Sequence, residues 1–345
     1  MTKAECPMRL IILVLPFVLA IVGPTNAGMN EVAQRQIIQH AVASAFTNGR
    51  FDELDTMADQ FRTSRERTES GVWKLTIFYS GFNYALLDPN YSAASLDRFE
   101  AQTLAWIKAR PNSPAAKIAY ALALSQRAWF LRGDDYYNKL TDQQRLGYIT
   151  SLRKRRDHLL AIKEEASKDP HWFTLMVAVA KEEGWPDEAF DRLVTEAAEH
   201  EPYYYQTYFL AIDRNLPQWG GSAEKMNAVV ARATDYTREL DGDSFKARGY
   251  WYASSYGRAV FDREKLVANW SEVAQGFQDL LSRYPDQWNH NAYAKFACLA
   301  KDRTRFLDAY SLIEGVAMAD VWDYPGQDMQ CAAWAKHPER NIEVK

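Results

Sequence analysis

Apolar residues recur at helical spacing along almost the whole chain. One such stripe, within residues 266–284, consists of Leu266, Trp270, Val273, Phe277, Leu280, Leu281 and Tyr284. A second, within residues 226–240, consists of Met226, Val229, Val230, Ala233, Thr237 and Leu240. Apolar positions three and four residues apart share one face of a helix, and the alternation typical of strands is rare. The pattern therefore predicts an all-α protein built of amphipathic helices.

Prolines mark the ends of several predicted helices. Pro111, Pro170, Pro202 and Pro285 each stand between two apolar segments. Because proline cannot continue a helix and disfavours the helical conformation of the residue before it, each predicts a corner between helices. The interval from Pro170 to Pro202 is close to the ~34-residue period of helix-turn-helix repeats of the tetratricopeptide type.

Residues 171–202 resemble a tetratricopeptide repeat. They combine the small residues Ala178 and Ala197, where two helices must approach closely, with a Gly-Trp-Pro turn at residues 184–186 and the closing Pro202. The resemblance implies a helical hairpin that stacks on neighbours of the same kind. Such units bury their apolar faces by stacking, and the stack curves to leave a concave surface.

Other units of this kind are looser and unequally spaced. Residues 40–62 and 288–316 follow the same helix-turn-helix plan, whereas the remaining corners are irregular. We therefore expect residues 28–345 to form one right-handed, tetratricopeptide-like α-α superhelix, a degenerate solenoid of about a dozen or more helices. A boundary near residues 241–243 is the alternative to a single body.

Three segments carry a second resemblance. Residues 128–137, 201–226 and 284–302 resemble an uncharacterised family of bacterial tetratricopeptide-like proteins. In that family an Ala-Trp-x-x-Arg-Gly helix end, a Leu-Pro-x-Trp-Gly-Gly-Ser corner and a Tyr-Pro-Asp-x-Trp-Asn segment occur in this order. The resemblance implies a fold, but no established activity and no catalytic residues.

The Leu-Pro-Gln-Trp-Gly-Gly-Ser segment is interpreted as a corner between helices. Its residues are Pro217, Trp219, Gly220, Gly221 and Ser222. Pro217 ends one helix, the glycines allow a tight turn, Ser222 caps the next helix, and Trp219 covers the joint. No strand precedes the glycines and no lysine follows them directly, which argues against a phosphate-binding loop. The Ser-x-x-Lys pattern that begins at Ser222 lacks the partner motifs of a serine acyltransferase.

The first 27 residues read as a secretory signal peptide. Lys3 and Arg9 precede an apolar run over residues 10–22, and small residues lead to Ala27, after which cleavage is expected. This predicts a periplasmic or secreted protein without a membrane span after cleavage. A retained membrane anchor is the alternative, although the run is shorter than the ~20 residues that a span needs.

The mature chain would keep two cysteines, Cys298 and Cys331. In an oxidising compartment a lone pair of cysteines favours a disulfide. Two buried free thiols are the alternative, because Cys298 lies in an apolar helical run.

Charge and histidine spacing disfavour several classes of function. The formal net charge is −4, from 41 basic and 45 acidic residues, which is unfavourable for binding nucleic acid. The six histidines lack the spacing of common metal sites, so the sequence predicts neither a metal nor a cofactor.

Our first functional hypothesis is a non-enzymatic scaffold that binds a protein or peptide partner in its concave groove. The candidate partner-binding residues are Tyr203, Tyr204, Tyr205 and Tyr208. Three consecutive tyrosines cannot all be buried on one side of a helix, and tyrosine offers a large contact area with a polar tip. The alternative is that one or two of them pack internally and the others are merely exposed.

The second hypothesis is an envelope protein that binds or hydrolyses glycans by aromatic stacking and a carboxylate pair. Its candidate acids are Glu182, Glu183 and Asp187. General acid-base work needs two convergent carboxylates, one of them with a raised pKa. This hypothesis predicts a deep pocket with a buried acid, whereas the scaffold predicts an elongated groove without one.

Overall fold

The computed structural model describes residues 30–86, 91–256, 260–261, 268–315, 317–337 and 339. Within these ranges the chain forms sixteen α-helices and two 3-10 helices, and β-pairing is limited to a bridge between Arg67 and Trp73. The prediction of an all-α helical-repeat superhelix is confirmed. The predicted signal peptide, residues 1–27, lies outside the described residues.

The helices of the first half of the chain are α1 (Glu31–Thr47), α2 (Phe51–Ser64), α3 (Lys74–Leu86), α4 (Ala93–Ala109), α5 (Pro114–Arg132), η1 (Tyr137–Lys139), α6 (Asp142–Ala161), α7 (Lys163–Ala166) and α8 (Pro170–Glu182). Those of the second half are α9 (Asp187–His200), α10 (Gln206–Asn215), η2 (Pro217–Trp219), α11 (Ala223–Asp241), α12 (Ser244–Ser254), α13 (Trp270–Arg283), α14 (Gln287–Leu299), α15 (Arg303–Ser311) and α16 (Gln327–Lys336).

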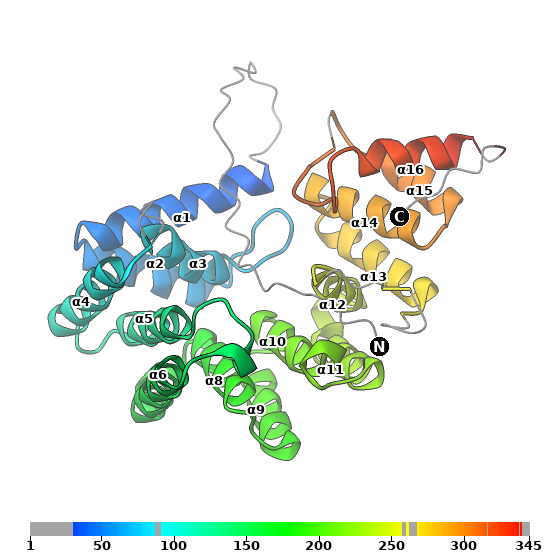
Figure 1. Ribbon diagram of the computed structural model, residues 1–345. Coiled ribbons are helices and arrows are strands. Elements are labelled where there is room, and N and C mark those ends of the chain that lie inside the picture. The colour runs from blue at the N-terminus through cyan, green and yellow to red at the C-terminus, as the bar shows by residue number, and fades with distance from the viewer. Residues whose placement is uncertain are drawn as a thin grey trace.

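The helices follow one another along an arc. Figure 1 shows α8, α10 and α12 on its inner side and α9, α11 and α13 on its outer side. Each inner helix packs on the neighbouring inner helix or on an outer one, as α10 does on both α8 and α11. The arc brings α1 at one end opposite α14 and α16 at the other (Figure 1).

The corners between helices lie at the prolines that predicted them. Pro170 is the first residue of α8, Pro202 lies between α9 and α10, and Pro285 lies between α13 and α14. Polar residues then cap the next helix: the Asp169 side chain accepts a hydrogen bond from a backbone N–H of α8, and the Asp286 side chain does the same for α14. A proline that ends one helix and a cap that begins the next set each turn.

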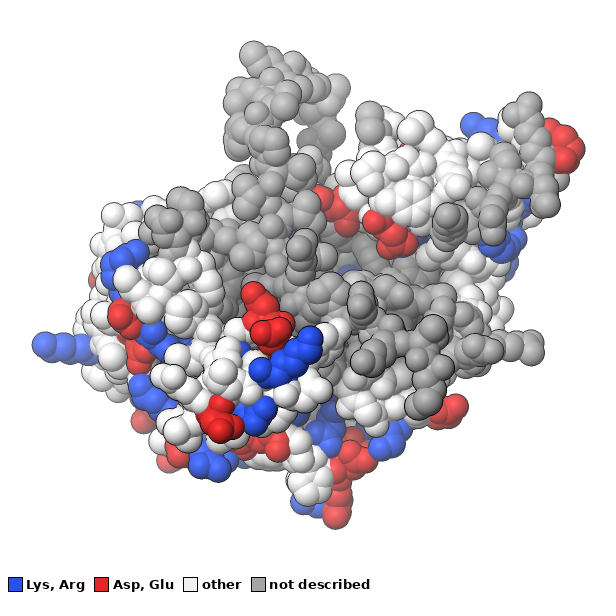
Figure 2. All heavy atoms as spheres, viewed as in Figure 1, with Lys and Arg blue, Asp and Glu red and all other residues white. Residues whose placement is uncertain are grey.

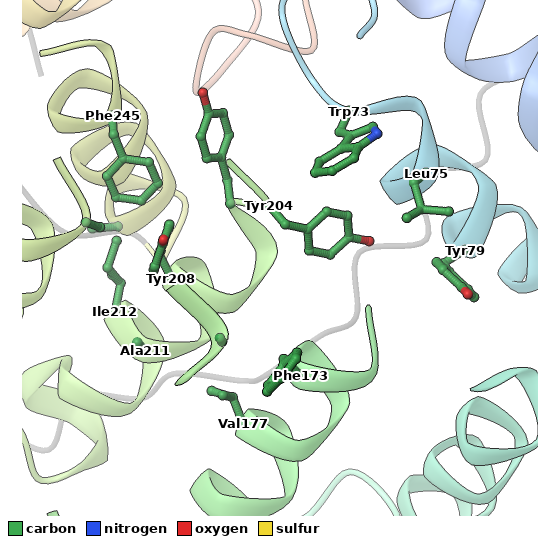
Figure 3. Close-up of a cluster of buried hydrophobic side chains, with 14 of the residues drawn as sticks. Trp73, Leu75, Tyr79, Phe173, Val177, Tyr204, Tyr208, Ala211, Ile212 and Phe245 are labelled. Atoms are coloured by element: carbon green, nitrogen blue, oxygen red, sulfur yellow. The ribbon is translucent and has the colours of Figure 1, made fainter. Parts of the chain in front are cut away.

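One hydrophobic core runs through the repeats. It extends from Val42 of α1 to Ala335 of α16 and includes the fully buried Trp106 and Trp172. Figure 3 shows one part of it, where Phe173, Tyr204 and other side chains from α3, α8, α10 and α12 meet. Stacking of this kind gives each repeat the apolar neighbours that it cannot supply itself.

A disulfide fastens the last helix to the superhelix. Cys298 of α14 and Cys331 of α16 are bonded, with their Cα atoms 5.9 Å apart, and both side chains are buried. The described helices also include none that is long and apolar enough to cross a membrane.

Residues 216–222 form the corner between α10 and α11. Gly220 has a φ of 85°, and the Ser222 hydroxyl accepts a hydrogen bond from the Lys225 N–H at 3.2 Å. A Cβ on Gly221 would lie 2.1 Å from the Asn215 carbonyl oxygen, so a larger residue does not fit. Trp219 covers the joint only in part, since 48% of its surface is exposed.

Candidate functional site

Three of the four candidate tyrosines are buried. Tyr204 and Tyr208 are 1% exposed and Tyr205 is 6% exposed, whereas Tyr203 is half-buried. The Tyr204 hydroxyl lies 2.9 Å from Nδ1 of buried His171, and the Tyr208 hydroxyl donates to the Pro202 carbonyl. Their burial contradicts the expectation that Tyr204, Tyr205 and Tyr208 form an accessible partner-binding surface.

The tyrosines are covered in part by residues 65–73, the segment between α2 and α3, which we call the 65–73 loop. Figure 1 shows this loop reaching from α2 and α3 toward α12 and α14. It is a tight turn in which the Thr68 N–H donates to the Val72 carbonyl and the Gly71 N–H donates to the Thr68 carbonyl. At its end, Trp73 packs edge-on against Tyr204, with ring centroids 5.3 Å apart (Figure 3).

Helix α1 holds one side of the loop. The fully buried Glu31 carboxylate accepts hydrogen bonds from the Thr68 hydroxyl at 2.8 Å and from the Ser70 N–H at 2.9 Å. Arg35 forms an ion pair with Glu31 at 2.5 Å. Burial raises the pKa of Glu31, but the Arg35 charge and the hydrogen bonds from Ser70 outweigh it and leave that pKa below its ordinary value.

The inner helices hold the other side of the loop. Arg248 of α12 and Asn289 of α14 both donate to the Ser70 carbonyl oxygen, at 2.6 and 3.1 Å. Gly71 has a φ of 86°, and a Cβ there would lie 2.6 Å from both Arg248 and Tyr284. The loop therefore needs glycine at this position both for its backbone conformation and for its close approach to α12.

An arginine of the loop lies among the tyrosines. Arg67 donates to the Tyr205 hydroxyl at 3.0 Å, and that hydroxyl in turn donates to the buried Asp241 carboxylate. The guanidinium lies 5.1 Å from the Tyr205 ring centroid and 6.0 Å from that of Tyr284. Sequence reasoning assigned the tyrosines to a partner, whereas the structure pairs Tyr205 with the chain's own Arg67.

A group of half-buried aromatic side chains lies beyond the loop. We call it the aromatic row, and its members are Phe209 of α10, Trp251 and Tyr252 of α12, Tyr256, and Trp288 of α14. The Phe209 and Tyr252 rings stack at 4.7 Å, and the Trp251 and Trp288 rings stack at 6.2 Å.

Two members of the aromatic row share a helix face with a contact of the loop. Phe209 lies four residues after Tyr205, and Tyr252 lies four residues after Arg248, which places each pair one turn apart on one face. Beside the row, Lys181 forms an ion pair with Asp213 at 2.7 Å. Burial raises the pKa of Tyr252, and the negative charge of Asp213 adds to the effect.

Sequence reasoning missed the aromatic row. Its one local signal is the segment Tyr250-Trp251-Tyr252, since three consecutive aromatic residues in a helix cannot all face the same core. The pairing of Phe209 with Tyr252 depends on tertiary packing and leaves no local signal.

The three candidate acids are committed to ion pairs. Glu182 pairs with buried Arg155, and Glu183 pairs with Arg156 at 3.0 Å. Asp187 contacts two cations at 2.9 Å, and their hydrogen bonds lower its pKa to about 2. A carboxyl group with so low a pKa is ionised at neutral pH and cannot act as a general acid. The geometry therefore does not favour a catalytic carboxylate pair here.

A groove of about 480 Å³ lies between α2 and the start of α5. Its acids are also engaged: Asp55 accepts a hydrogen bond from Ser113 at 2.5 Å, and Asp59 pairs with Arg62 at 2.6 Å. Burial raises the pKa of Asp55. Across the described ranges, no group of three or more His, Cys, Asp or Glu side chains could hold a metal ion.

Basic and acidic side chains are interspersed on the described part of the face in Figure 2. Among the described residues of this face, no large area carries a single charge that would attract nucleic acid.

The family comparison covers the first part of the superhelix. Residues 39–209 match the family model described as "Domain of unknown function (DUF4034)". The matched segment contains the 65–73 loop and the start of the aromatic row at Phe209, whereas α11 to α16 lie beyond it. No curated protein and no solved structure matches the chain.

Proposed function

We propose that the protein is an exported, non-enzymatic scaffold of the tetratricopeptide type, which holds a protein or peptide partner against the inner side of its superhelix. The aromatic row is the observation that carries this proposal. Concave surfaces of helical repeats are well suited to extended partners. Half-buried tyrosine and tryptophan side chains are typical anchors of such interfaces, because they combine a large contact area with a polar tip.

The proposed export has two supports. Residues 1–27 have the sequence pattern of a signal peptide. The Cys298–Cys331 disulfide is of a kind that forms and persists in oxidising compartments and is rare in the cytosol of most organisms.

Glycan binding is the second candidate function, because sugar rings also stack on aromatic side chains. The aromatic row offers a surface on which sugar rings could stack. However, the charged side chains beside the row, Lys181 and Asp213, already form an ion pair with each other. The ion pairs of Glu182 and Glu183 count against hydrolysis in particular. We therefore place a polypeptide partner first.

The test uses the disulfide-bonded protein as bait in cross-linked envelope extract. Two variants, Tyr252→Ala and Trp288→Ala, each remove one aromatic side chain of the row. The matched control is Tyr137→Ala, because Tyr137 lies on η1 and is 51% exposed. Circular dichroism melts establish that all variants are folded.

A partner captured by the native protein and by the Tyr137 variant, but lost with the two variants of the aromatic row, is the expected result. Equal capture by all four proteins would move the partner to another surface. No protein capture, together with retention on an immobilised glycan that the row variants abolish, would favour the second candidate.

A further inference from the structure

We propose that the 65–73 loop occupies a peptide-recognition site of its own superhelix, and that a partner's segment with the same chemistry takes this site when the loop leaves it. The proposal rests on the proposed scaffold function and names the kind of partner. The site is formed by Glu31 of α1, Asp241 of α11, Arg248 of α12 and Asn289 of α14. The expected segment has an arginine followed four residues later by glycine.

The main chain of the loop is recognised directly. The Ser70 carbonyl accepts two hydrogen bonds, from Arg248 and Asn289, and the Ser70 N–H donates to Glu31. Three side chains from three separate helices thus bind the main-chain N–H and carbonyl groups of Ser70. Hydrogen bonds to the main chain give affinity for polypeptide as a class, and side-chain pockets then select the sequence.

Two features select the sequence. The first is the pocket around Arg67, where Tyr205 accepts a hydrogen bond, the Tyr203 ring centroid lies 5.9 Å away, and Asp241 supplies the negative charge at 3.9 Å. The second is the close approach at Gly71, where a Cβ would meet Arg248. A segment with an arginine and, four residues later, a glycine fits both the arginine pocket and the close approach to Arg248.

The loop leaves part of the site unused. Arg248 Nε and Asn289 Oδ1 are buried and have no hydrogen-bond partner in the described part of the chain. Buried polar groups in proteins are usually satisfied, and these two are among ten buried side-chain atoms without a partner in the described residues. The loop is tethered at both ends, to Ser64 of α2 and to Lys74 of α3, which limits how it can sit. A free segment has no such restraint.

The experiment supplies the loop as a separate peptide. Its sequence is SRERTESGVWK, residues 64–74, with a fluorescent label at its N-terminus. The receptors are the native protein and two variants. In Gly71→Val the added side chain clashes with Arg248 and with the Tyr284 ring, and in Arg67→Ala the internal loop loses its anchor. Fluorescence anisotropy measures binding, and circular dichroism measures folding.

Both loop variants are expected to bind the peptide at least tenfold more tightly than the native protein, whose site is filled. A peptide with alanine at its Arg67 position should bind at least tenfold more weakly. Asn289→Ala in the Arg67→Ala protein should also weaken binding, because it removes a donor to the peptide carbonyl.

Should Gly71→Val not fold, the Arg67→Ala protein carries the test, since that change adds no atoms. Folded variants that do not bind the peptide would overturn the proposal and leave the loop as a permanent closure of the superhelix. If the variants do not bind the peptide but the native protein still captures a partner through the aromatic row, the scaffold function stands and only the recognition site is rejected. Peptide binding without any such capture would instead reject the aromatic row as the anchor.

Discussion

Asp169 offers a quantitative test of the packing in the core. It caps α8 with no exposed surface: its carboxylate accepts hydrogen bonds from the His171 N–H at 2.9 Å and the Tyr79 hydroxyl at 2.7 Å. Burial raises its pKa from 3.8 to about 6, although both hydrogen bonds act in the opposite direction. Asp169→Asn keeps the shape of the cap and removes the charge.

The sign and size of the effect follow from proton linkage. The folded carboxyl group has the higher pKa, so its contribution to stability is fully present below pH 3.8 and is lost as the pH rises through about 6. A difference of about 2 pKa units corresponds to about 3 kcal/mol of unfolding free energy. Asparagine does not titrate, so the variant should gain most of this, about 2 kcal/mol, relative to the native protein between pH 4 and pH 7.5.

Urea denaturation followed by circular dichroism at pH 4, 5, 6 and 7.5 measures this difference. The His171 titration is common to both proteins and largely cancels. Asp302→Asn is the control, because Asp302 also caps a helix, yet hydrogen bonds from Trp270 and Arg305 outweigh its burial and lower its pKa. Asp302 is ionised in both the folded and the unfolded protein above pH 5, so the stability difference between its variant and the native protein should stay nearly constant from pH 5 to pH 7.5. Parallel pH profiles for the native and Asp169→Asn proteins would refute the reasoning.

Three further changes test other parts of the structure by denaturation. Reducing the disulfide between α14 and α16 should lower the unfolding free energy by about 2–4 kcal/mol, and an unchanged midpoint would contradict its role. Gly71→Ala should cost about 2–4 kcal/mol, because it combines a positive φ with a close contact, whereas Gly184→Ala, with a positive φ and open space, should cost about 1 kcal/mol. Glu182→Gln should cost about 3–5 kcal/mol, since it leaves Arg155 buried without its carboxylate. Glu188→Gln breaks an exposed pair and should cost under about 0.5 kcal/mol, so equal costs for the two glutamates would contradict the burial argument.

The helical architecture was predictable because its signals are local. Pro170 and Pro202 mark corners through their own backbone restrictions, and the apolar stripe that includes Val273 and Phe277 forms the buried face of α13. These features act over one or two helical turns, which a single sequence contains in full.

The site was predictable only in part because its contacts are distant in sequence. Three consecutive tyrosines before α10 suggested a partner-binding surface. In the structure, however, the Tyr205 hydroxyl is hydrogen-bonded to Arg67, which is 138 residues away in the chain. Nothing near either residue indicates this contact. Cys331 could be named as the disulfide partner of Cys298 from the sequence, because the mature chain would offer no other cysteine. The stacking of Phe209 on Tyr252 could be seen only in the folded structure.

The most direct test of the central claim is photocross-linking in the cell envelope, with benzoylphenylalanine replacing Tyr252 in the aromatic row. The same replacement at exposed Tyr137 is the comparison. The scaffold account predicts a protein adduct from position 252 and none of the same mass from position 137. An adduct from position 137 alone, or no protein adduct from position 252 in a folded variant, would contradict it.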